Sequence, residues 1–241
     1  KSGFARDLTA GGGTVTYTLA SAAGNNQPST RYSNSRLQSA FNFDALDNNH
    51  SIFAVSRYTG GDNERVVSSV TQNWLFGHWG SGNQRWHANG WIHENPPGDT
   101  ATTFSVYAGI IGPAAERGFW RDGTQLRDNA GGYNGGSYKP GRVELGSWSN
   151  GSESSNAEVS ELLFINRNVN EAERIAIMNS LAAKYNLSLG AQDIYLGDDP
   201  GNGDYDFNLV GIGRLNGTNQ LLSAGQAGFG LEATSIADDG D

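Results

Sequence analysis

The chain has 241 residues, and its 16 basic and 25 acidic residues give a formal net charge of −9 at neutral pH. It contains no cysteine, which excludes a disulfide scaffold, a cysteine-based zinc site and thiol catalysis. Nucleic acid is a poor candidate partner because phosphate binding needs a clustered positive field. No apolar run reaches the roughly 18–20 residues of a membrane span, so the composition predicts an acidic globular protein without membrane insertion.

Short strand-like runs, separated by clusters of Gly, Asn, Asp and Ser, dominate the chain. This regular alternation of strands and turns favours an antiparallel β-sandwich. Residues 1–36 offer at most one strand, at 14–19. Further strands are expected at 37–43, 51–58, 65–70, 73–79, 103–111, 118–121, 142–148 and 158–166. The Asp122–Gly123 pair lies between two runs and predicts a type I′ hairpin.

One helix is expected over residues 171–185, after these strands. Asn170 can cap it, and Glu173 completes a capping-box pattern. Ile175, Met178 and Tyr185 fall on one stripe, so the helix should cover an end or edge of the sandwich. We therefore expect a jelly roll over 1–190, with its strand-rich core at about 37–166 and its helix at 170–185.

After residue 190 the sequence becomes acidic and glycine-rich, with strand candidates at 209–214, 220–224 and 228–236. We interpret residues 191–241 as a second β-module that is incomplete in this chain. The chain begins with Lys1, with neither a start methionine nor a signal segment, and it ends at Asp241 in a turn-like sequence. It is therefore expected to be a piece of a larger protein.

Two stretches resemble a known family. Residues 157–167 (AEVSELLFINR), with 170–174 (NEAER) and 181–187 (LAAKYNL), resemble the final strand and following helix of bacterial laminin-G-like domains. These domains belong to the concanavalin A-like lectin/glucanase jelly rolls. Upstream, 73–78 (NWLFGH), 88–91 (ANGW) and 119–123 (FWRDG) match the same pattern, which covers roughly residues 37–190. The resemblance implies an all-β jelly-roll sandwich of two antiparallel sheets with one sealing α-helix.

The tail carries a second resemblance. Residues 205–214 (YDFNLVGIGR) are similar to a β-module that follows such jelly rolls in very large bacterial surface proteins, including calcium-dependent repeat adhesins. This resemblance implies an extracellular setting on the bacterial cell surface and neighbouring domains in the same large protein. The nonapeptide calcium repeat of those proteins is absent from this sequence.

The catalytic motif of the related glucanases is missing. Retaining glucanases of this fold place two carboxylates about 5–5.5 Å apart on one face of a strand. The nearest match begins at Glu158, but Ser160 and Leu162 occupy the positions that need carboxylates, and Glu161 falls on the opposite face by strand parity. The sequence therefore predicts a protein that is not an enzyme.

The segment 79–91 combines aromatic, polar and glycine residues. Sugar binding uses a flat aromatic ring against the C–H side of a pyranose, with amides or a guanidinium for the hydroxyls. The candidate carbohydrate-binding residues are Trp79, Asn83, Arg85, Trp86 and Asn89. The alternative is that these tryptophans only fill the sandwich, as large aromatics commonly do. The resemblance places Trp91 in a strand, which favours a core position for it.

Calcium is the predicted cofactor. Residues 198–208 gather six Asp and Asn side chains, and hard cations take six to eight oxygen ligands. The candidate metal ligands are Asp198, Asp199, Asn202, Asp204, Asp206 and Asn208. The spacing is not that of an EF-hand, and the open alternative is an acidic turn that water solvates.

Together these features predict a non-catalytic module of a bacterial surface adhesin. It would bind carbohydrate with the help of calcium, its partner being a glycan or another ligand on a host or biofilm surface, or it would present a neighbouring binding domain. A polysaccharide-degrading enzyme domain and a purely structural or peptide-binding spacer remain the alternatives, because this fold hosts all three classes.

Overall fold

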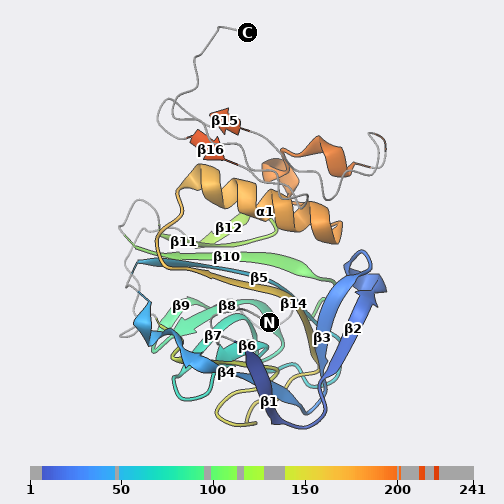
Figure 1. Cartoon of the computed structure of the whole chain (residues 1–241), viewed down its shortest axis with the longest axis vertical. Helices are drawn as coiled ribbons and strands as arrows, with labels where there is room; N and C mark the ends of the chain where they lie inside the picture. The colour runs from blue at the N-terminus through green and yellow to red at the C-terminus, as the bar shows by residue number, and fades with distance from the viewer. Residues whose placement is uncertain are drawn as a thin grey trace, which may run out of the picture.

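The computed structural model describes residues 7–46, 49–94, 99–112, 117–127, 139–199, 201, 212–214 and 220–222. Within these residues, two antiparallel sheets of seven strands pack face to face, and one α-helix lies against the outside of the second sheet (Figure 1). The predicted all-β sandwich with a sealing helix is confirmed.

The first sheet, sheet A, carries the aromatic segment that the sequence singles out. Its strands lie in the order β1 (Leu8–Gly12), β4 (Arg36–Asn42), β13 (Arg142–Leu145), β6 (Val67–Ser69), β7 (Trp74–Trp79), β8 (Gly82–Ala88) and β9 (Trp91–Glu94). Thus β7, β8 and β9 form a meander at one end of the sheet, and β1 forms the other end.

The second sheet, sheet B, lies between sheet A and the helix. Its strands lie in the order β12 (Thr124–Arg127), β11 (Gly118–Arg121), β10 (Ser105–Ile111), β5 (His50–Tyr58), β14 (Ala157–Ile165), β3 (Gln27–Tyr32) and β2 (Thr16–Ser21). Strands β5, β10 and β14 form its buried centre, and β2 and β12 are its edges.

Aromatic side chains fill the space between the two sheets. The Phe76 ring lies 5.3 Å from Trp86 and 5.5 Å from Phe119, measured between ring centroids. Gly109 on β10 faces these rings, and a Cβ atom there would lie 2.6 Å from Phe76 and 2.8 Å from Trp86. Glycine is therefore required at this position because the aromatic rings occupy the space of a side chain.

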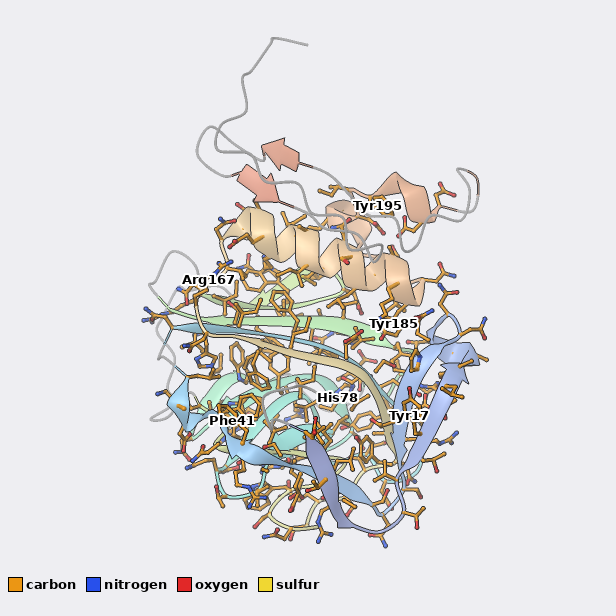
Figure 2. The ribbon with its side chains drawn as sticks, viewed as in Figure 1. Tyr17, Phe41, His78, Arg167, Tyr185 and Tyr195 are labelled. Atoms are coloured by element: carbon orange, nitrogen blue, oxygen red, sulfur yellow. The ribbon has the colours of Figure 1, made fainter. Side chains whose placement is uncertain are left out.

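Helix α1 (Glu171–Tyr185) begins with the predicted capping box. The Asn170 side chain accepts from the Glu173 amide and the Glu173 carboxylate accepts from the Asn170 amide, both at 2.9 Å. The helix ends at Asn186 in the left-handed conformation, with φ of 51°. Its apolar face, which includes Met178 and Tyr185, packs on the outer face of sheet B (Figure 2).

Three tight hairpins use residues with positive φ. The predicted turn at Asp122–Gly123 is confirmed, with φ values of 49° and 78°. Two further turns join the strands of the β7–β8–β9 meander, at Gly80–Ser81 and Asn89–Gly90. The strand-like runs of the sequence did not include β8 or β9, although the resemblance places Trp91 in a strand and an Asn–Gly pair between two runs is a strong hairpin signal.

Several shorter elements complete the described chain. Residues Ala22–Gly24, Phe43–Ala45, Gly190–Gln192 and Leu196–Asp198 form 3-10 helices. In the tail, β15 (Ile212–Arg214) pairs with β16 (Gln220–Leu222) in an antiparallel manner, within two of the three strands predicted there. The third predicted strand, at 228–236, lies outside the described residues. The division into units 1–190 and 191–241 stays a prediction.

Candidate functional site

The predicted carbohydrate-binding residues lie on the β7–β8–β9 meander of sheet A. Trp79 ends β7, Asn83, Arg85 and Trp86 lie on β8, and Asn89 lies in the exposed turn before β9. The segment 79–91 is therefore part of a regular β-meander. Arg85 and Trp86 are adjacent on β8, so their side chains point to opposite faces of the sheet.

Two of the five candidates point into the protein. Trp86 is fully buried in the core between the sheets, and Asn83 is only 2% exposed. The Asn83 amide donates to the carbonyl of Ala101 at 3.0 Å, so it holds the 99–105 segment against the sandwich. Neither side chain can meet a ligand from solvent, and for these two residues the packing alternative is correct.

Trp79 and Trp91 form a pair of indoles on the outer face of sheet A. Their ring centroids lie 5.4 Å apart at an angle of 45°, and both side chains are partly exposed. His87 lies edge-on to Trp91, with 4.9 Å between centroids. The expectation that Trp91 belongs to the core is wrong, because its neighbour Ile92 takes the inward position. We call Trp79 and Trp91 the indole pair.

Arg85 lies beneath the indole pair. Its guanidinium carbon is 5.3 Å from the Trp79 ring centroid and 5.7 Å from that of Trp91, and the residue is 3% exposed. Its Nε has no hydrogen-bond partner, and its nearest carboxylate, Glu94, is 3.5 Å away and half exposed. The attraction between the guanidinium and the two indole rings therefore supplies much of the stabilisation of this buried cation. The same attraction keeps both rings close to Arg85.

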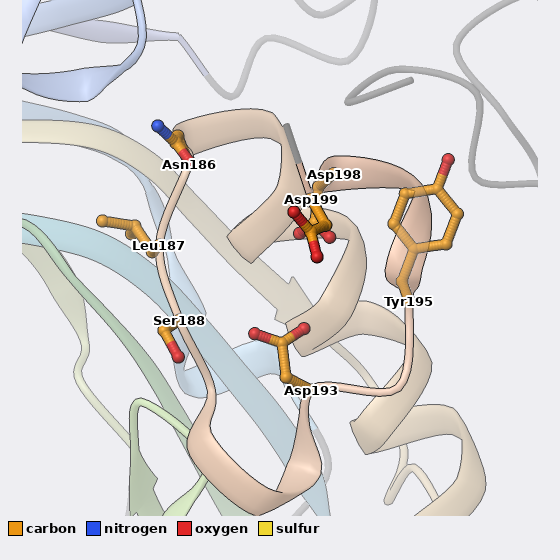
Figure 3. Close-up of a pocket in the computed structure, with 7 residues that line it drawn as sticks. All are labelled: Asn186, Leu187, Ser188, Asp193, Tyr195, Asp198 and Asp199. Carbon is orange, nitrogen blue, oxygen red and sulfur yellow. The ribbon is translucent and has the colours of Figure 1, made fainter. Parts of the chain in front are cut away.

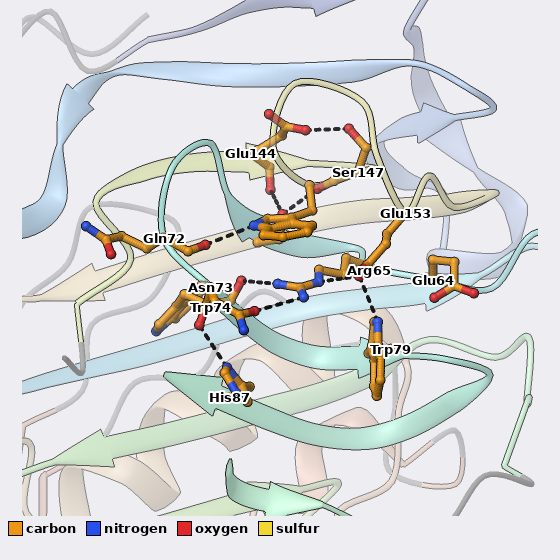
Figure 4. A network of polar contacts seen from close by, with 12 residues as sticks. Glu64, Arg65, Gln72, Asn73, Trp74, Trp79, His87, Glu144, Ser147 and Glu153 are labelled. Carbon is orange, nitrogen blue, oxygen red and sulfur yellow. Dashed lines mark hydrogen bonds and ion pairs between the residues drawn. The ribbon is translucent and has the colours of Figure 1, made fainter. Parts of the chain in front are cut away.

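The loop 146–155 folds over the outer face of sheet A and fixes Trp79 (Figure 4). The Glu153 carboxylate accepts from the Trp79 indole N–H at 2.8 Å and from Arg65 Nε at 2.6 Å. Glu153 itself adopts a left-handed backbone conformation with φ of 45°. This conformation costs a non-glycine residue free energy, so the contacts around Glu153 must impose it.

Arg65 and Trp148 anchor the same loop from the other side. The Arg65 guanidinium carbon lies 4.3 Å from the Trp148 ring centroid, and the Trp148 indole N–H donates to the carbonyl of Gln72 at 2.9 Å. Arg65 also donates to the Asn73 side chain at 2.9 Å. Because Asn73 precedes β7, these bonds tie the loop to the strand that carries Trp79.

Glu144 on β13 is a fully buried carboxylate on this outer face, also beneath the loop. One oxygen accepts from the Ser147 hydroxyl at 2.5 Å, and the other accepts from the Gln38 amide at 2.7 Å and from the Asn150 backbone at 3.1 Å. These donors replace water around the charge. Glu144 therefore serves to hold the loop and is closed to a ligand.

Most of the described carboxylates on the two outer faces already form hydrogen bonds or ion pairs within the protein. Glu158, the residue nearest to a glucanase motif, is 3% exposed and pairs with Arg57 at 2.6 Å on sheet B. In the segment before β6, burial and the neighbouring Glu153 carboxylate raise the pKa of Glu64. Glu64 and Glu153 are thus two interacting carboxylates beside Trp79.

A separate open cavity of about 350 Å³ lies between the end of α1 and the 193–199 segment (Figure 3). Its lining residues are Asn186, Leu187, Ser188, Asp193, Tyr195, Asp198 and Asp199. Two of the predicted calcium ligands, Asp198 and Asp199, line this cavity together with Asp193, which the sequence analysis did not include. The other four, Asn202, Asp204, Asp206 and Asn208, lie outside the described residues. Among the described residues, no three His, Cys, Asp or Glu side chains come close enough together to hold a metal ion.

No protein-family model matches the chain, and no curated protein matches its sequence. In the described part of the chain, no helix is long and apolar enough to cross a membrane. The fold, by contrast, is similar to that of several solved structures.

The binding domain of Paraclostridial Mosquitocidal Protein 1 aligns with a TM-score of 0.52 and 13% identity, over 74% of this chain and 48% of that one. The binding domain of Botulinum Neurotoxin DC, solved in complex with SialylT, aligns at 0.48 and 12% identity, over 75% of this chain and 47% of that one. Domain 4 of AbnA, a GH43 extracellular arabinanase from Geobacillus stearothermophilus, solved in complex with arabinotriose, aligns at 0.45 and 12% identity, over 66% and 78%. The chain spans about half the length of the two toxin domains, and the likeness to the mosquitocidal domain concerns the β-sandwich fold.

Proposed function

We propose that the chain is a non-catalytic carbohydrate-binding module and that the indole pair on the outer face of sheet A is its sugar-binding platform. The observation that carries this proposal is the arrangement of Trp79 and Trp91, partly exposed, side by side and held from beneath by Arg85. A pyranose ring presents an apolar face of C–H groups that fits such a surface. Residues Trp79 and Arg85 of the sequence-based set belong to this site, Arg85 as a positioning residue.

Rigidity supports the assignment. The Trp79 indole N–H is already bonded to Glu153, and the buried Arg85 guanidinium lies within 6 Å of both ring centroids. The rings therefore need no reordering when a sugar binds, and the entropic cost of fixing them is met in the free protein. Asn89, exposed in the adjoining turn, can donate to a sugar hydroxyl at the margin of the platform.

Charge around the platform favours a neutral glycan. The partly or fully exposed charges beside the indole pair are carboxylates, those of Glu64, Glu94 and Glu153. The two cations, Arg65 and Arg85, are 5% and 3% exposed and face these carboxylates and the rings. With a net charge of −9 on the whole chain, an anionic sugar would approach against the local field.

A glycan array followed by calorimetry on the best neutral oligosaccharide tests the proposal. Trp79→Ala and Trp91→Ala should each weaken binding at least about tenfold, which corresponds to about 1.4 kcal/mol. Tyr17→Ala is the matched control, since it removes an aromatic ring that is 61% exposed on a strand at the other end of the sandwich. Equal binding by the two tryptophan variants and the parent would exclude the platform.

The cellular setting and the calcium site are further parts of the proposal. The resemblance of the sequence to adhesin modules supports an extracellular place on a bacterial surface, beside other domains of the same protein. Calcium would bind at the acidic tail, whose Asp198 and Asp199 line the same cavity as Asp193. EDTA should then lower the melting temperature, and Asp204→Ala with Asp206→Ala should remove most of this response. An unchanged response in the double variant would place the metal elsewhere.

An enzyme remains the second candidate because Glu64 and Glu153 interact beside Trp79. Burial and the Glu153 carboxylate raise the pKa of Glu64, which would suit a general acid in glycoside hydrolysis. Against this role, Glu153 is bonded to both Arg65 and Trp79. Reducing-sugar release from the bound oligosaccharide that is lost in Glu64→Gln would support the enzyme and overturn the non-catalytic assignment.

A further inference from the structure

The six tryptophans of the chain divide between the core and one outer face. Trp79, Trp91 and Trp148 are partly exposed, belong to neither core cluster and lie on the outer side of sheet A. The other three are at most 6% exposed and lie in the core: Trp74, Trp86 and Trp120. Exposed apolar groups that gather on one face commonly mark an interaction surface. The indole pair accounts for only two of the three rings on this face.

Trp148 is held in the same way as the indole pair, over a buried arginine. Its ring centroid lies 4.3 Å from the guanidinium carbon of Arg65, and its indole N–H donates to the carbonyl of Gln72 at 2.9 Å. Because Arg65 is only 5% exposed, the exposed part of Trp148 is the side turned away from this guanidinium. The ring is therefore already fixed when a sugar meets its free side.

Asn73 and His87 lie between Trp148 and the indole pair (Figure 4). Arg65, over which Trp148 lies, donates to the side-chain oxygen of Asn73 at 2.9 Å. The backbone carbonyl of Asn73 accepts from Nδ1 of His87 at 2.8 Å. The His87 ring in turn lies edge-on to Trp91, with 4.9 Å between centroids. A continuous row of contacts thus joins the third indole to the pair.

This row leaves one hydrogen-bond donor and one acceptor between the rings. A guanidinium only donates, so the Asn73 atom bonded to Arg65 is oxygen, and its NH₂ group has no partner within the described residues. A carbonyl only accepts, so Nδ1 of the neutral His87 ring carries the proton and Nε2 keeps its lone pair. Burial lowers the pKa of His87, which keeps the ring neutral at neutral pH. A sugar hydroxyl both donates and accepts, so it fits this pair of groups.

We propose that the sugar-binding surface runs from the indole pair across Asn73 and His87 to Trp148. Its ligand is then a stretch of several units in a linear neutral polysaccharide. This extension of the surface rests on the proposed function and adds a requirement for chain length. Stacking at two separate places needs at least two sugar rings, and a hydroxyl between them meets Asn73 and His87. A mono- or disaccharide reaches only part of such a surface.

Calorimetry with the disaccharide and the hexasaccharide of the best neutral series tests the length requirement. The parent chain should bind the hexasaccharide at least about tenfold more tightly than the disaccharide. In Trp148→Ala this ratio should fall toward one, whereas Trp79→Ala should weaken binding at both lengths. A parent-like ratio in Trp148→Ala would overturn the third contact and leave the platform in place. Parent-like affinity of Trp79→Ala at both lengths would overturn the proposed function itself.

Asn73→Asp tests the middle of the surface, because aspartate keeps the acceptor for Arg65 and lacks the NH₂ donor. It should weaken hexasaccharide binding about fivefold. Asn34→Asp is the matched control, since it adds the same charge in the exposed turn between β3 and β4 and should bind as the parent does. Equal affinity of the two variants would contradict the proposed donor.

Oxidation of exposed indoles by N-bromosuccinimide tests the same surface in the unaltered chain, with peptide mass spectrometry to locate each product. Trp148 should react in the free protein, the hexasaccharide should protect it, and the disaccharide should protect it much less. Trp86, which is fully buried, serves as the unreactive control. A Trp148 that is unreactive in the free protein, or equally reactive with hexasaccharide bound, would overturn the inference. Failure of the hexasaccharide to protect Trp79 and Trp91 would count against the platform instead.

Discussion

The carboxylate of Glu153 accepts the indole N–H of Trp79 at 2.8 Å, and the two residues lie 74 positions apart in the sequence. Glu153 thereby links the loop that folds over sheet A to one ring of the indole pair. Because the same carboxylate oxygen also accepts from Arg65, one side chain fixes both the platform and the loop.

Glu153→Gln should lower the free energy of unfolding by about 2 kcal/mol, because Arg65 loses a charged acceptor while it stays buried. Urea unfolding measures this loss. Glu94→Gln is the control, since the Glu94 side chain is 51% exposed and 3.5 Å from Arg85. That change should stay within about 0.5 kcal/mol. Equal effects would mean that the Glu153 contact adds no more than a surface ion pair.

Asn170→Ala should destabilise the protein by about 1 kcal/mol, because it removes the acceptor for the Glu173 amide at the start of α1. Thermal unfolding detects this change. Asn186→Gly, at the other end of the helix, should leave stability equal or higher, since φ is 51° there and glycine adopts it without strain. A melting temperature unchanged by Asn170→Ala would contradict the capping role.

Asn179→Leu should release the segment that follows the helix. The buried Asn179 amide donates to the carbonyl of Gln192, and its oxygen accepts from the amides of Ile194 and Tyr195. Leucine makes none of these bonds, so the two amides should exchange hydrogen much faster while those of sheet B keep their protection. Protection retained at both positions would show that packing alone holds the segment.

The stability of the protein should depend on His78 in mildly acidic solution. Burial and the charge of Arg121 lower the pKa of His78 from 6.5 to about 3. Between these pH values the unfolded chain binds a proton that the folded chain does not, so the free energy of unfolding falls as the pH falls, by up to about 1.4 kcal/mol per pH unit. His78→Phe keeps an aromatic ring beside Tyr58 and Tyr107 and should flatten this dependence. Identical pH profiles would contradict the assignment.

The sequence predicted those elements whose signals are local. The capping box at Asn170 and Glu173 and the turn at Asp122–Gly123 depend on neighbouring residues, and both are confirmed. Strands β1 and β3 were not predicted because residues 1–36 are rich in Gly, Ser, Asn and Thr. These strands form by pairing with β4 and β14, far along the chain, which propensity does not report.

The site was predictable only in part, for the same reason. The sequence predicts that Arg85 donates hydrogen bonds to a sugar. Its burial beneath two rings, however, depends on Trp79 and Trp91, which come from different strands. Glu158 shows the same limit, since its partner Arg57 lies opposite it in the register of β14 and β5. Long-range register decides both environments, and spacing along the chain does not encode it.

Helix α1 occupies the outer face of sheet B, so a single copy can offer only one sheet face to a polymer. Under the carbohydrate-binding proposal, such a molecule would coat a polysaccharide chain without bridging two of them. Gel formation or precipitation of a long polysaccharide on mixing with the protein would therefore indicate that each protein particle offers more than one sugar-binding face. Cross-linking of the polysaccharide thus depends on helix α1, which covers one sheet face, as directly as on the indole pair on the other.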